Sequence, residues 1–342
     1  MRQGQNPAKL DMPAYQPQRL AIATLVYIPF QEGYFAHSLE VFLYHLASVH
    51  QYTSEPFNYL VFDNGSCAEV KRELQSLHET GWIDWLVLSQ HNLGKTGALN
   101  FILSGIPNQW VCYTDSDMLF RPGWLEESWK IEANFPNIGM IGAQVVFPDW
   151  EEDKGNTAFR KTTDARFHFD QVQPEDWILD EYCRGRGISG EREKVYRRMQ
   201  LDRVTNTETG VQAFLGGNSH QQFLARRAVL QEILPLPASL QLSRKEDTYQ
   251  DVELDRRGYL HLTTTRPYLY HMGNVVDEAL RPELEKLRLP ENVKPPTLKK
   301  THTSQKLHPV ERILFWLAGK PALRRRLVRL YQFLHRTLSE VS

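Results

Sequence analysis

Short apolar runs alternate with longer amphipathic segments from residue 20 to residue 115, and this alternation constrains the fold more than any other feature of the chain. The apolar runs predict strands at 20–29, 57–63, 83–89 and 109–115. The segments between them predict helices at 38–53, 68–81 and 97–106. Strands that alternate with helices form mainly parallel sheets with helices on both faces. The sequence therefore predicts an α/β fold of this kind.

Further apolar segments follow the first four strands. Residues 139–147 predict another strand, and the apolar pattern returns at 211–233 and 251–271. Ligands on parallel sheets bind at the carboxyl ends of the strands. In this sequence those ends carry Pro29, Asp63, Asn92 and Asp115. The sequence thus predicts a ligand site along this edge of the sheet.

The charge balance and the cysteines exclude several classes of protein. The chain has 40 Lys and Arg against 41 Asp and Glu, a formal net charge of −1. Nucleic-acid-binding chains carry a clear basic excess, so we expect no nucleic-acid partner. Cys67, Cys112 and Cys183 are far apart and form no CxxC motif, which argues against a disulfide framework or a zinc site and favours the cytoplasm. We see no secretory signal or membrane-spanning run, and we expect a soluble protein or one that lies on a membrane surface.

Residues 151–210 differ sharply in composition from the rest of the chain. Of these 60 residues, 24 are charged, with 11 Lys and Arg and 13 Asp and Glu. One interpretation is a solvated, partly helical insertion. The other is a mobile flap over a substrate, because long functional loops often border binding sites.

The two ends of the chain also stand apart. Residues 1–18 are polar and predict a flexible tail, and the prolines and lysines of 290–309 predict a linker. Residues 308–342 carry seven Lys and Arg against two Glu, and leucines recur there at helical spacing. The apolar face consists of Leu323, Leu327, Leu330 and Leu334. The predicted basic helix over 310–342 either packs on the domain or lies on an anionic membrane surface.

Two carboxylates, Asp115 and Asp117, flank Ser116 at the end of the strand predicted at 109–115. A carboxylate pair at the end of a buried strand is costly unless a cation neutralises it. Mg²⁺ or Mn²⁺ on a diphosphate would do so, because these ions bind one or two carboxylates together with phosphate oxygens. The alternative is a surface turn with two solvated aspartates, which the position after a buried strand disfavours.

Two glycine-containing turns follow neighbouring strands. The turn at 63–66 follows a parallel-type strand, which favours a ligand-facing loop over a hairpin. Residues 91–100 contain Gly-Lys-Thr but fail the Walker A pattern, because position 89 is a serine. They still place Lys95 at a helix start, where a diphosphate would bind well.

Two further segments carry titratable residues near the end of the predicted domain. Glu246 and Asp247 open a helical stretch that Gly258 ends, where they serve either the helix dipole or general-base catalysis. His271 follows an aromatic strand and is either structural or a metal ligand.

Taken in order, these motifs resemble a family 2 glycosyltransferase with the GT-A fold. The resemblance covers residues 20–275, about three quarters of the chain. It rests on YIPFQE, VFDNGS, NLGKTGALN, YTDSDMLF, FLGGN, ED with GY eleven residues after its Asp, and HMGN. It implies a GT-A domain over 19–289 with a Rossmann-like, mixed and mainly parallel sheet, the charged insertion and the C-terminal helical tail.

The resemblance also implies roles for residues at matching positions. Contacts with a nucleotide sugar are implied for Pro29, Glu32, Asp63, Asn64, Asn92, Gly94, Lys95, Asn100, Asp115 and Ser116. Metal ligands are implied at Asp115, Asp117 and His271, and acceptor-side contacts at Gly216, Gly217 and Asn218. Gln31 and Asn64 differ from the Asn and Asp that the family usually carries there.

The implied reaction moves a sugar, with inversion, from a nucleoside-diphosphate sugar to a hydroxyl of a glycan, a lipid-linked sugar or another acceptor. A UDP-sugar is favoured as the donor. Asp247 of the Glu246–Asp247 motif is implied as the base, with Glu246 or Asp251 next in line. Mn²⁺ or Mg²⁺ would stabilise the departing diphosphate. We expect a cytoplasmic enzyme, at the inner face of the membrane if the tail binds lipid.

Two alternatives remain open. A nucleotidyltransferase acting on sugar phosphates uses a related sheet, but it would carry a Gly-rich loop with a basic residue after the first strand, which YIPFQEGYF lacks. A non-catalytic nucleotide-sugar-binding protein would lack the base or the carboxylate pair, and this chain has both.

Overall fold

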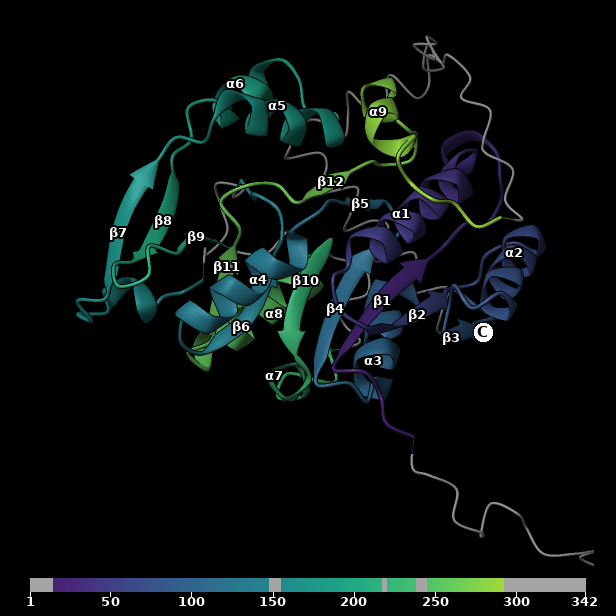
Figure 1. Ribbon diagram of the computed structural model, residues 1–342, viewed down its shortest axis with the longest axis horizontal. Coiled ribbons are helices and arrows are strands. Elements are labelled where there is room, and N and C mark those ends of the chain that lie inside the picture. Colours follow the sequence, from purple (N-terminus) through teal and green to yellow (C-terminus); the bar gives the residue numbers. More distant parts are fainter. Residues whose placement is uncertain (1–14, 148–154, 217–219, 238–244, 292–342) are drawn as a thin grey trace, which may run out of the picture. The chain divides into compact units, whose positions relative to one another are not determined.

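The computed structural model describes residues 15–147, 155–216, 220–237 and 245–291 (Figure 1). All of these belong to one compact unit, residues 1–296, and the second unit, residues 297–342, lies outside the described residues. The tail predicted at 1–18 is described only from residue 15. The predicted linker at 290–309 is described only to residue 291, and the predicted helix at 310–342 lies outside the description.

The strands of the described chain form one large mixed sheet and one small sheet. The large sheet has ten strands in the order β3-β2-β1-β4-β10-β6-β11-β9-β8-β7. Their bounds are β1 Leu20–Val26, β2 Phe57–Asp63, β3 Trp85–Leu88, β4 Trp110–Asp115, β6 Ile138–Gly142, β7 Phe167–Val172, β8 Leu201–Asn206, β9 Gln212–Leu215, β10 Gln222–Arg226 and β11 Leu260–Thr263. Strands β3, β2, β1 and β4 run parallel, as do β6 and β11. The other pairs of neighbouring strands are antiparallel, so the predicted mixed sheet is confirmed.

Strand β1 shows why the sheet forms where the sequence predicts it. Its LAIATLV run buries every residue except the half-buried Leu25, as a strand covered on both faces requires. The register places Val26 of β1 beside Asp63 of β2, and Leu25 beside Asp115 of β4. The carboxyl ends of these three parallel strands therefore meet at one edge.

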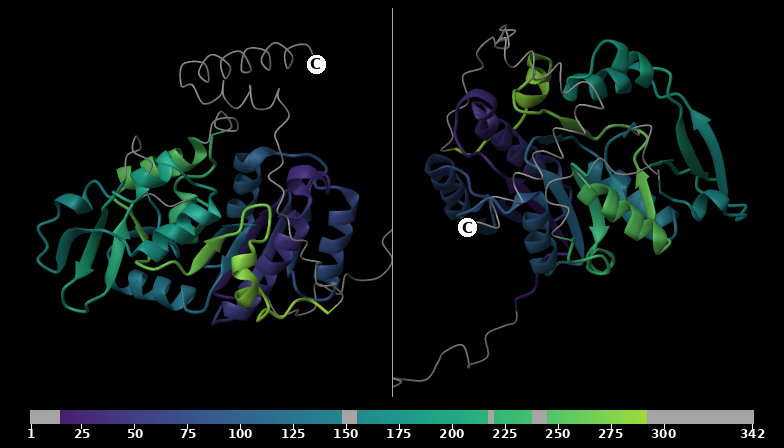
Figure 2. Two further views of the ribbon diagram at one scale, coloured as in Figure 1. Left: turned by 90° about the horizontal axis from the view of Figure 1, so that it is seen from above. Right: turned by 180° about the vertical axis from the view of Figure 1, so that it is seen from behind.

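Helices cover both faces of the sheet, as predicted (Figures 1 and 2). The helices are α1 Ser38–Tyr52, α2 Ala68–Glu79, α3 Gly94–Gly105, α4 Trp124–Asn134, α5 Asp176–Gly185, α6 Glu191–Tyr196, α7 Arg227–Gln231, α8 Lys245–Arg256 and α9 Arg281–Leu284. Leu20 and Ile22 of β1 pack in one core with α1, α2 and α4. The alternate residues Ala21 and Ala23 pack in a second core with α3, α7 and α8.

A second, two-stranded sheet carries two of the predicted metal ligands at its end. Strand β5 (Met118–Phe120) pairs antiparallel with β12 (Leu269–His271), and Met118 lies opposite His271. Asp117, the residue before β5, is thereby brought beside His271. Strand β5 is not predictable from the sequence, because three residues are too few for a periodic pattern.

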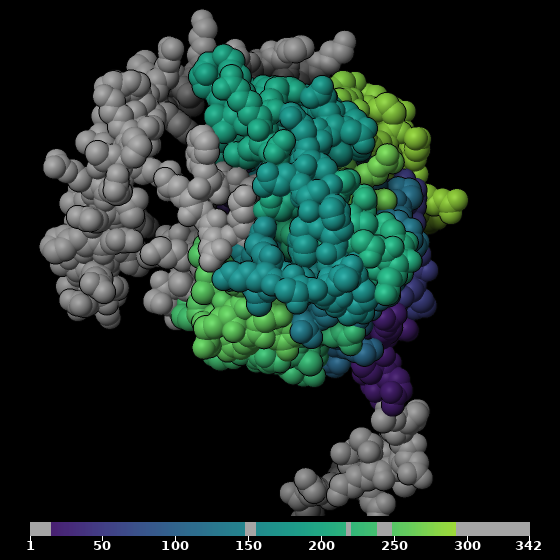
Figure 3. Space-filling model, turned by 90° about the vertical axis from the view of Figure 1, so that its left-hand side faces the viewer, coloured from purple at the N-terminus to yellow at the C-terminus, as the bar shows by residue number. Residues whose placement is uncertain are grey.

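Residues 155–216 contain helices, as one interpretation of the charged segment holds, but they also extend the large sheet. Strands β7, β8 and β9 form its antiparallel end, and α5 and α6 lie between β7 and β8 in the chain. Figure 3 shows this segment covering the face of the molecule nearest the viewer. The segment has a small core of its own with residues of the preceding chain: Val145, Phe147, Ile178, Leu179, Cys183, Ile188, Tyr196, Leu201 and Phe214.

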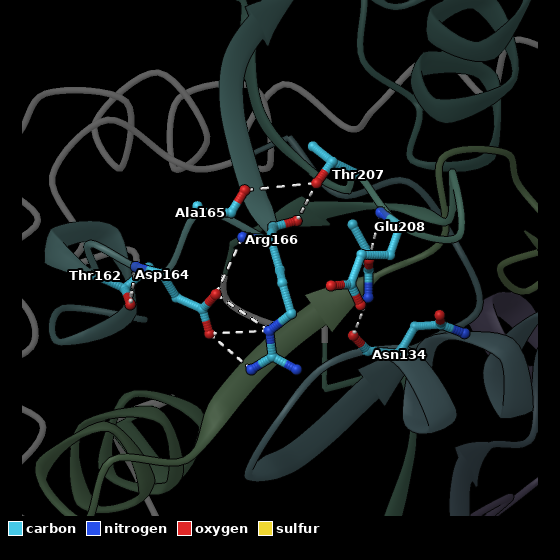
Figure 4. Close-up of polar contacts among 8 residues, drawn as sticks. Asn134, Thr162, Asp164, Ala165, Arg166, Thr207 and Glu208 are labelled. Atoms are coloured by element: carbon cyan, nitrogen blue, oxygen red, sulfur yellow. Dashed lines mark hydrogen bonds and ion pairs between the residues drawn. The ribbon is translucent and has the colours of Figure 1, made fainter.

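Polar contacts lie where β7 begins and β8 ends (Figure 4). The Arg166 guanidinium binds the Asp164 carboxylate at 2.7 Å, and the Thr207 hydroxyl donates to the Arg166 carbonyl at 3.1 Å. The Asn206 side-chain amide donates to the Asn134 carbonyl at the end of α4, at 3.0 Å. The β7–β8 pair is thus tied to the central part of the fold.

Arg121, which follows β5, connects that part of the chain to α5 and α9. Its guanidinium forms paired hydrogen bonds of 2.8 and 2.9 Å with Glu181 of α5. It forms a second pair, also 2.8 and 2.9 Å, with Glu283 of α9. The guanidinium is largely buried, at 16% side-chain exposure, so this cluster holds α5 and α9 against the chain that follows β5.

The strand expected over 139–147 is shorter than predicted. Strand β6 ends at Gly142, because Ala143 leaves the ladder: its amide donates to the Gln222 side chain and its carbonyl accepts from the Tyr268 amide. Side-chain and loop partners therefore replace strand pairing. Within the described ranges, no helix combines the length and apolar character needed to cross a bilayer.

Candidate active site

Asp115, the last residue of β4, is held by a lysine from the neighbouring helix. Lys95 in the first turn of α3 lies 3.1 Å from Asp115 Oδ1 and 3.2 Å from Oδ2. The Tyr113 hydroxyl donates to Asp115 Oδ1 at 2.7 Å. Burial raises the pKa of Asp115 above its usual range, and the nearby Lys95 ammonium offsets only part of this rise. The sequence predicted both residues at the site but not their ion pair.

Asp117 and His271 form the second polar pair at this edge. Asp117 Oδ2 lies 3.1 Å from His271 Nε2. The other ring nitrogen, Nδ1, donates to the Gly185 carbonyl at 2.7 Å, which fixes the orientation of the ring. Burial lowers the pKa of His271, but the hydrogen bond and charge of Asp117 outweigh it and raise the pKa overall.

Gly185 is a site residue that sequence reasoning missed. A Cβ atom at this position would lie 2.5 Å from the His271 carbonyl oxygen, too close for any side chain. Glycine therefore allows the end of α5 to pack directly on the strand that carries His271. One glycine in a charged segment gives no sequence signal for such a contact.

Asp117 and His271 have the chemistry to hold a divalent cation. Asp117 Oδ1 is buried and meets no hydrogen-bond donor among the described residues, which is costly unless another partner binds it. In the described ranges, no group of three His, Cys, Asp or Glu side chains lies close enough to form a complete protein site. Asp115 faces Lys95 instead. A carboxylate and an imidazole would thus need oxygens from a ligand to complete the coordination, as is common for Mg²⁺.

The predicted nucleotide side of the edge is a tight polar network. Asp63 is fully buried and accepts a hydrogen bond from the Ser66 amide at 3.1 Å. The Asn64 side chain donates to Asn92 Oδ1 at 3.0 Å and accepts from the Leu93 amide at 2.8 Å. Asn92 Oδ1 also accepts from the Gly94 amide at 2.8 Å. These bonds join the loop after β2 to the start of α3.

Three of the four other predicted contacts lie at the same edge as this network, and one does not. Glu32 is exposed and Pro29 and Ser116 are half-buried, all three in turns at the same edge. Asn100 lies elsewhere: it donates to the Leu236 carbonyl at 2.9 Å and accepts from the Leu236 amide at 2.6 Å. Both ends of its amide are therefore engaged in tying α3 to the chain after α7, rather than turned toward the other predicted contacts.

The predicted acceptor side is only partly described. Glu246 and Asp247 lie in the first turn of α8, and their side chains are outside the described residues. Gly217 and Asn218 are also outside them. The Gly216 amide lies 3.5 Å from the His261 carbonyl, so this loop starts beside β11.

The sequence of the domain matches a known family. Residues 30–188 match the family model for glycosyl transferase family 2. This part of the chain, residues 30–188, is therefore similar to the family 2 glycosyltransferases. The matched range includes Asp63, Asn92, Asp115 and Asp117 but ends before α8 and His271.

Solved structures resemble the chain at low sequence identity, whereas no curated protein matches it. A mannosyltransferase from Pyrobaculum calidifontis, PcManGT, in complex with GDP-Man and Mn²⁺, is 16% identical, with a TM-score of 0.42 over 73% of this chain and 55% of that one. S. aureus TarS 1-349 in complex with UDP is 14% identical, with a TM-score of 0.40 over 72% and 58%. GalNAc-T7 with UDP, GalNAc and Mn²⁺ is 13% identical, with a TM-score of 0.44 over 75% and 43%. The chain thus spans about half the length of these proteins, and the similarity to family 2 rests on the sequence match.

Proposed function

We propose that the protein is an inverting, metal-dependent glycosyltransferase that uses a nucleoside-diphosphate sugar, with a UDP-sugar favoured. The observation that carries the proposal is the Asp117–His271 pair with its unpartnered carboxylate oxygen, in a domain similar to those of family 2. Asp117 follows β4, at the strand end where α/β sheets bind ligands, and His271 is the last residue of β12.

In this proposal the donor lies along the edge from Asp63 to Asp117. Asp63 and the Asn64–Asn92 network support the nucleoside, while Gly94 and Lys95 at the start of α3 face the diphosphate. Asp117 and His271 would hold Mn²⁺ or Mg²⁺, which supplies positive charge to the departing diphosphate. Lys95 provides a further positive charge at the same place.

The chemical step is a single displacement at the anomeric carbon. The acceptor oxygen forms a bond to that carbon as the bond to the diphosphate oxygen breaks, and the configuration inverts. Asp247 takes the acceptor proton, and the nucleoside diphosphate leaves. The proposed acceptor is a hydroxyl of a glycan, a lipid-linked sugar or another molecule in the cytoplasm. The basic residues of 310–342 would favour an anionic membrane surface if that segment does not pack on the domain.

A binding and hydrolysis experiment tests this proposal. Melting temperatures are measured with UDP-, GDP-, ADP- and CDP-sugars, each with and without Mn²⁺, because a ligand of the native state raises the melting temperature. One donor should raise it in the presence of Mn²⁺, and the protein should slowly hydrolyse that donor without an acceptor. Full hydrolysis in excess chelator would contradict metal dependence, and no shift with any donor would contradict the function.

Asp247→Asn tests the base. The substitution keeps the size of the side chain but removes the proton acceptor, so turnover should fall by ~10²–10⁴-fold with donor affinity nearly unchanged. Asp255→Asn makes the same chemical change on the same helix, where the carboxylate accepts from the Thr157 amide, and should retain turnover. Equal turnover in the two variants would place the base elsewhere.

A further inference from the structure

Lys95 is held from two sides by elements that are distant in sequence. One side is the Asp115 carboxylate on β4. The other is the main-chain carbonyl of His220, which accepts a hydrogen bond from Lys95 Nζ at 3.2 Å. Lysine has a long, flexible side chain, so fixed partners determine where its charge lies. The position of the His220 carbonyl therefore bears directly on the charge at the donor site.

His220 has a backbone conformation that needs support. Its φ of +51° lies in the left-handed region, which non-glycine residues seldom adopt. Its side chain is buried, at 3% exposure, and Nε2 lies 3.0 Å from Asp251 Oδ2 on α8. The contact with Asp251 anchors the imidazole while the backbone turns its carbonyl toward Lys95.

Asp251 is itself fixed by a second histidine. Its other oxygen, Oδ1, lies 2.7 Å from Nδ1 of the fully buried His261 on β11. The backbone of His261 is bound on both sides by Asn156: its amide donates to the Asn156 side chain and its carbonyl accepts from it. Asp251 thus sits between two histidines that other contacts hold in place.

Both oxygens of the Asp251 carboxylate face histidine nitrogens. Burial alone would raise the pKa of its carboxyl, but the two histidines outweigh burial and hold the pKa well below the usual range. The geometry and the charge balance are those of an anchor between α8, β11 and residue 220.

We propose that Asp251 is a positioning residue that acts through His220 to hold Lys95 in place for the donor diphosphate. The proposal rests on the proposed function, because it takes Lys95 as a donor contact. It links α8, whose first turn contains the proposed base Asp247, to Lys95 at the start of α3. A change in α8 would then alter donor binding without any direct contact with the donor.

A double-mutant cycle on nucleotide binding tests the proposal. The affinity for the nucleoside diphosphate that binds best with Mn²⁺, from UDP, GDP, ADP and CDP, is measured by calorimetry for wild type, Asp251→Asn, Lys95→Met and the double variant. Asp251→Asn should weaken binding about tenfold, in the range of a hydrogen bond to a charged group. The double variant should bind no more weakly than Lys95→Met alone, because Asp251 acts through the lysine. Additive effects would overturn the proposal.

Two further variants separate positioning from general damage to the fold. Glu253→Gln removes a carboxylate from the same helix, where Glu253 pairs with Arg256 and Arg257 at the surface, and should leave nucleotide binding unchanged. His220→Gly permits the left-handed backbone but removes the anchoring imidazole, and should weaken binding as Asp251→Asn does. Wild-type affinity in folded His220→Gly would overturn the proposal even if Asp251→Asn does not fold.

A crystal structure of Asp251→Asn or His220→Gly, whichever folds better, tests the proposal without any nucleotide, because it shows where the residue-220 carbonyl lies. The residue-220 carbonyl should move out of hydrogen-bond distance of Lys95 Nζ. If it remains in place, the proposal is wrong. If wild type binds no nucleoside diphosphate, the proposed function is wrong. The position of the residue-220 carbonyl in the variant can still be compared with wild type in that case.

Discussion

The parallel part of the sheet, residues 20–115, and the segment 155–216 belong to the same sheet but are held by different forces. The first has strands buried on both faces and a network of neutral amides at its edge. The second has a small core and many arginine–carboxylate pairs, such as Arg160–Asp202 at 2.6 Å and Arg203–Asp170 at 2.5 Å. These pairs are partly buried, and ion pairs near the surface contribute less net stability than buried apolar area does. We therefore expect the parallel part to be rigid and the segment 155–216 to open locally at lower free energy.

The largest effect should come from the place where the two regions meet. Asp117 follows the parallel part, while its partner His271 is oriented by Gly185 of the segment 155–216. Asp117→Ala removes the carboxylate that is proposed to hold the cation, and should lower turnover at least ~10³-fold, or about 4 kcal/mol of barrier. Because the variant leaves both cores intact, its urea midpoint should stay near that of wild type. Donor hydrolysis at wild-type rate would exclude Asp117 from the site.

The second-largest effect should be a pH dependence of the unfolding free energy, which tests the packing around the parallel strands. His45 of α1 is fully buried: its Nδ1 donates to the Met118 carbonyl at 2.6 Å, and Nε2 lies 3.0 Å from the Thr24 hydroxyl. Burial lowers the pKa of His45 to about 4. Between that value and the unfolded value of about 6.5, the unfolded chain binds more protons, so stability is full above pH 6.5 and falls as the pH drops toward 4.

Protonation of His45 should lower the unfolding free energy by about 3 kcal/mol between pH 7 and pH 4. Urea unfolding of wild type and His45→Gln over this range measures it, and the variant should show a shallower pH dependence. His168→Gln, which changes an exposed histidine of β7, should keep the wild-type dependence. Parallel curves for wild type and His45→Gln would show that His45 is not the titrating group.

The smallest effect should be a loss of stability on substitution of Arg121, which tests how the segment 155–216 is held. Arg121→Met leaves Glu181 and Glu283 without their shared cation in a largely buried place. The variant should lower the unfolding free energy by about 2 kcal/mol. The loss should be smaller than for breaking a fully buried ion pair, because Glu283 is partly exposed. Hydrogen exchange should rise more in α5 and α9 than in β1 or β2. Arg281→Met, which breaks an exposed pair with Glu278, is the matched control and should cost under ~1 kcal/mol. Uniform loss of protection would mean that the two regions unfold together.

The same contrast explains how much of the molecule could be read from the sequence. Strand β2 spans 57–63 as predicted and α1 ends within a residue of the prediction, because an apolar pattern records burial directly. The site residues that follow such strands, Asp63 and Asp115, lie where parallel strands must end. Strands β7 and β8 were missed because charged residues along them conceal their alternation, whereas β9 lies in the apolar segment noted at 211–233.

The sequence carries no pattern that predicts contacts between distant segments. The Lys95–His220 and His220–Asp251 contacts depend on a left-handed residue and on single histidines, which carry no motif. Asn100 follows the expected spacing, yet its amide binds Leu236, because the chain after α7 returns across α3. Such pairings are set by the fold, and the fold must be known before they can be found.

The close approach of Gly185 to His271 limits how this protein can be recombined with related chains. The segment 155–216 looks like an exchangeable cassette, since it has its own small core and its own charge pairs. Yet the carbonyl that accepts from His271 Nδ1 belongs to Gly185 of that segment, and a β-carbon at Gly185 would lie only 2.5 Å from the His271 carbonyl oxygen. A chimaera that imports a homologous cassette must therefore keep glycine at the end of α5, or the histidine will be misaligned whatever the new cassette binds.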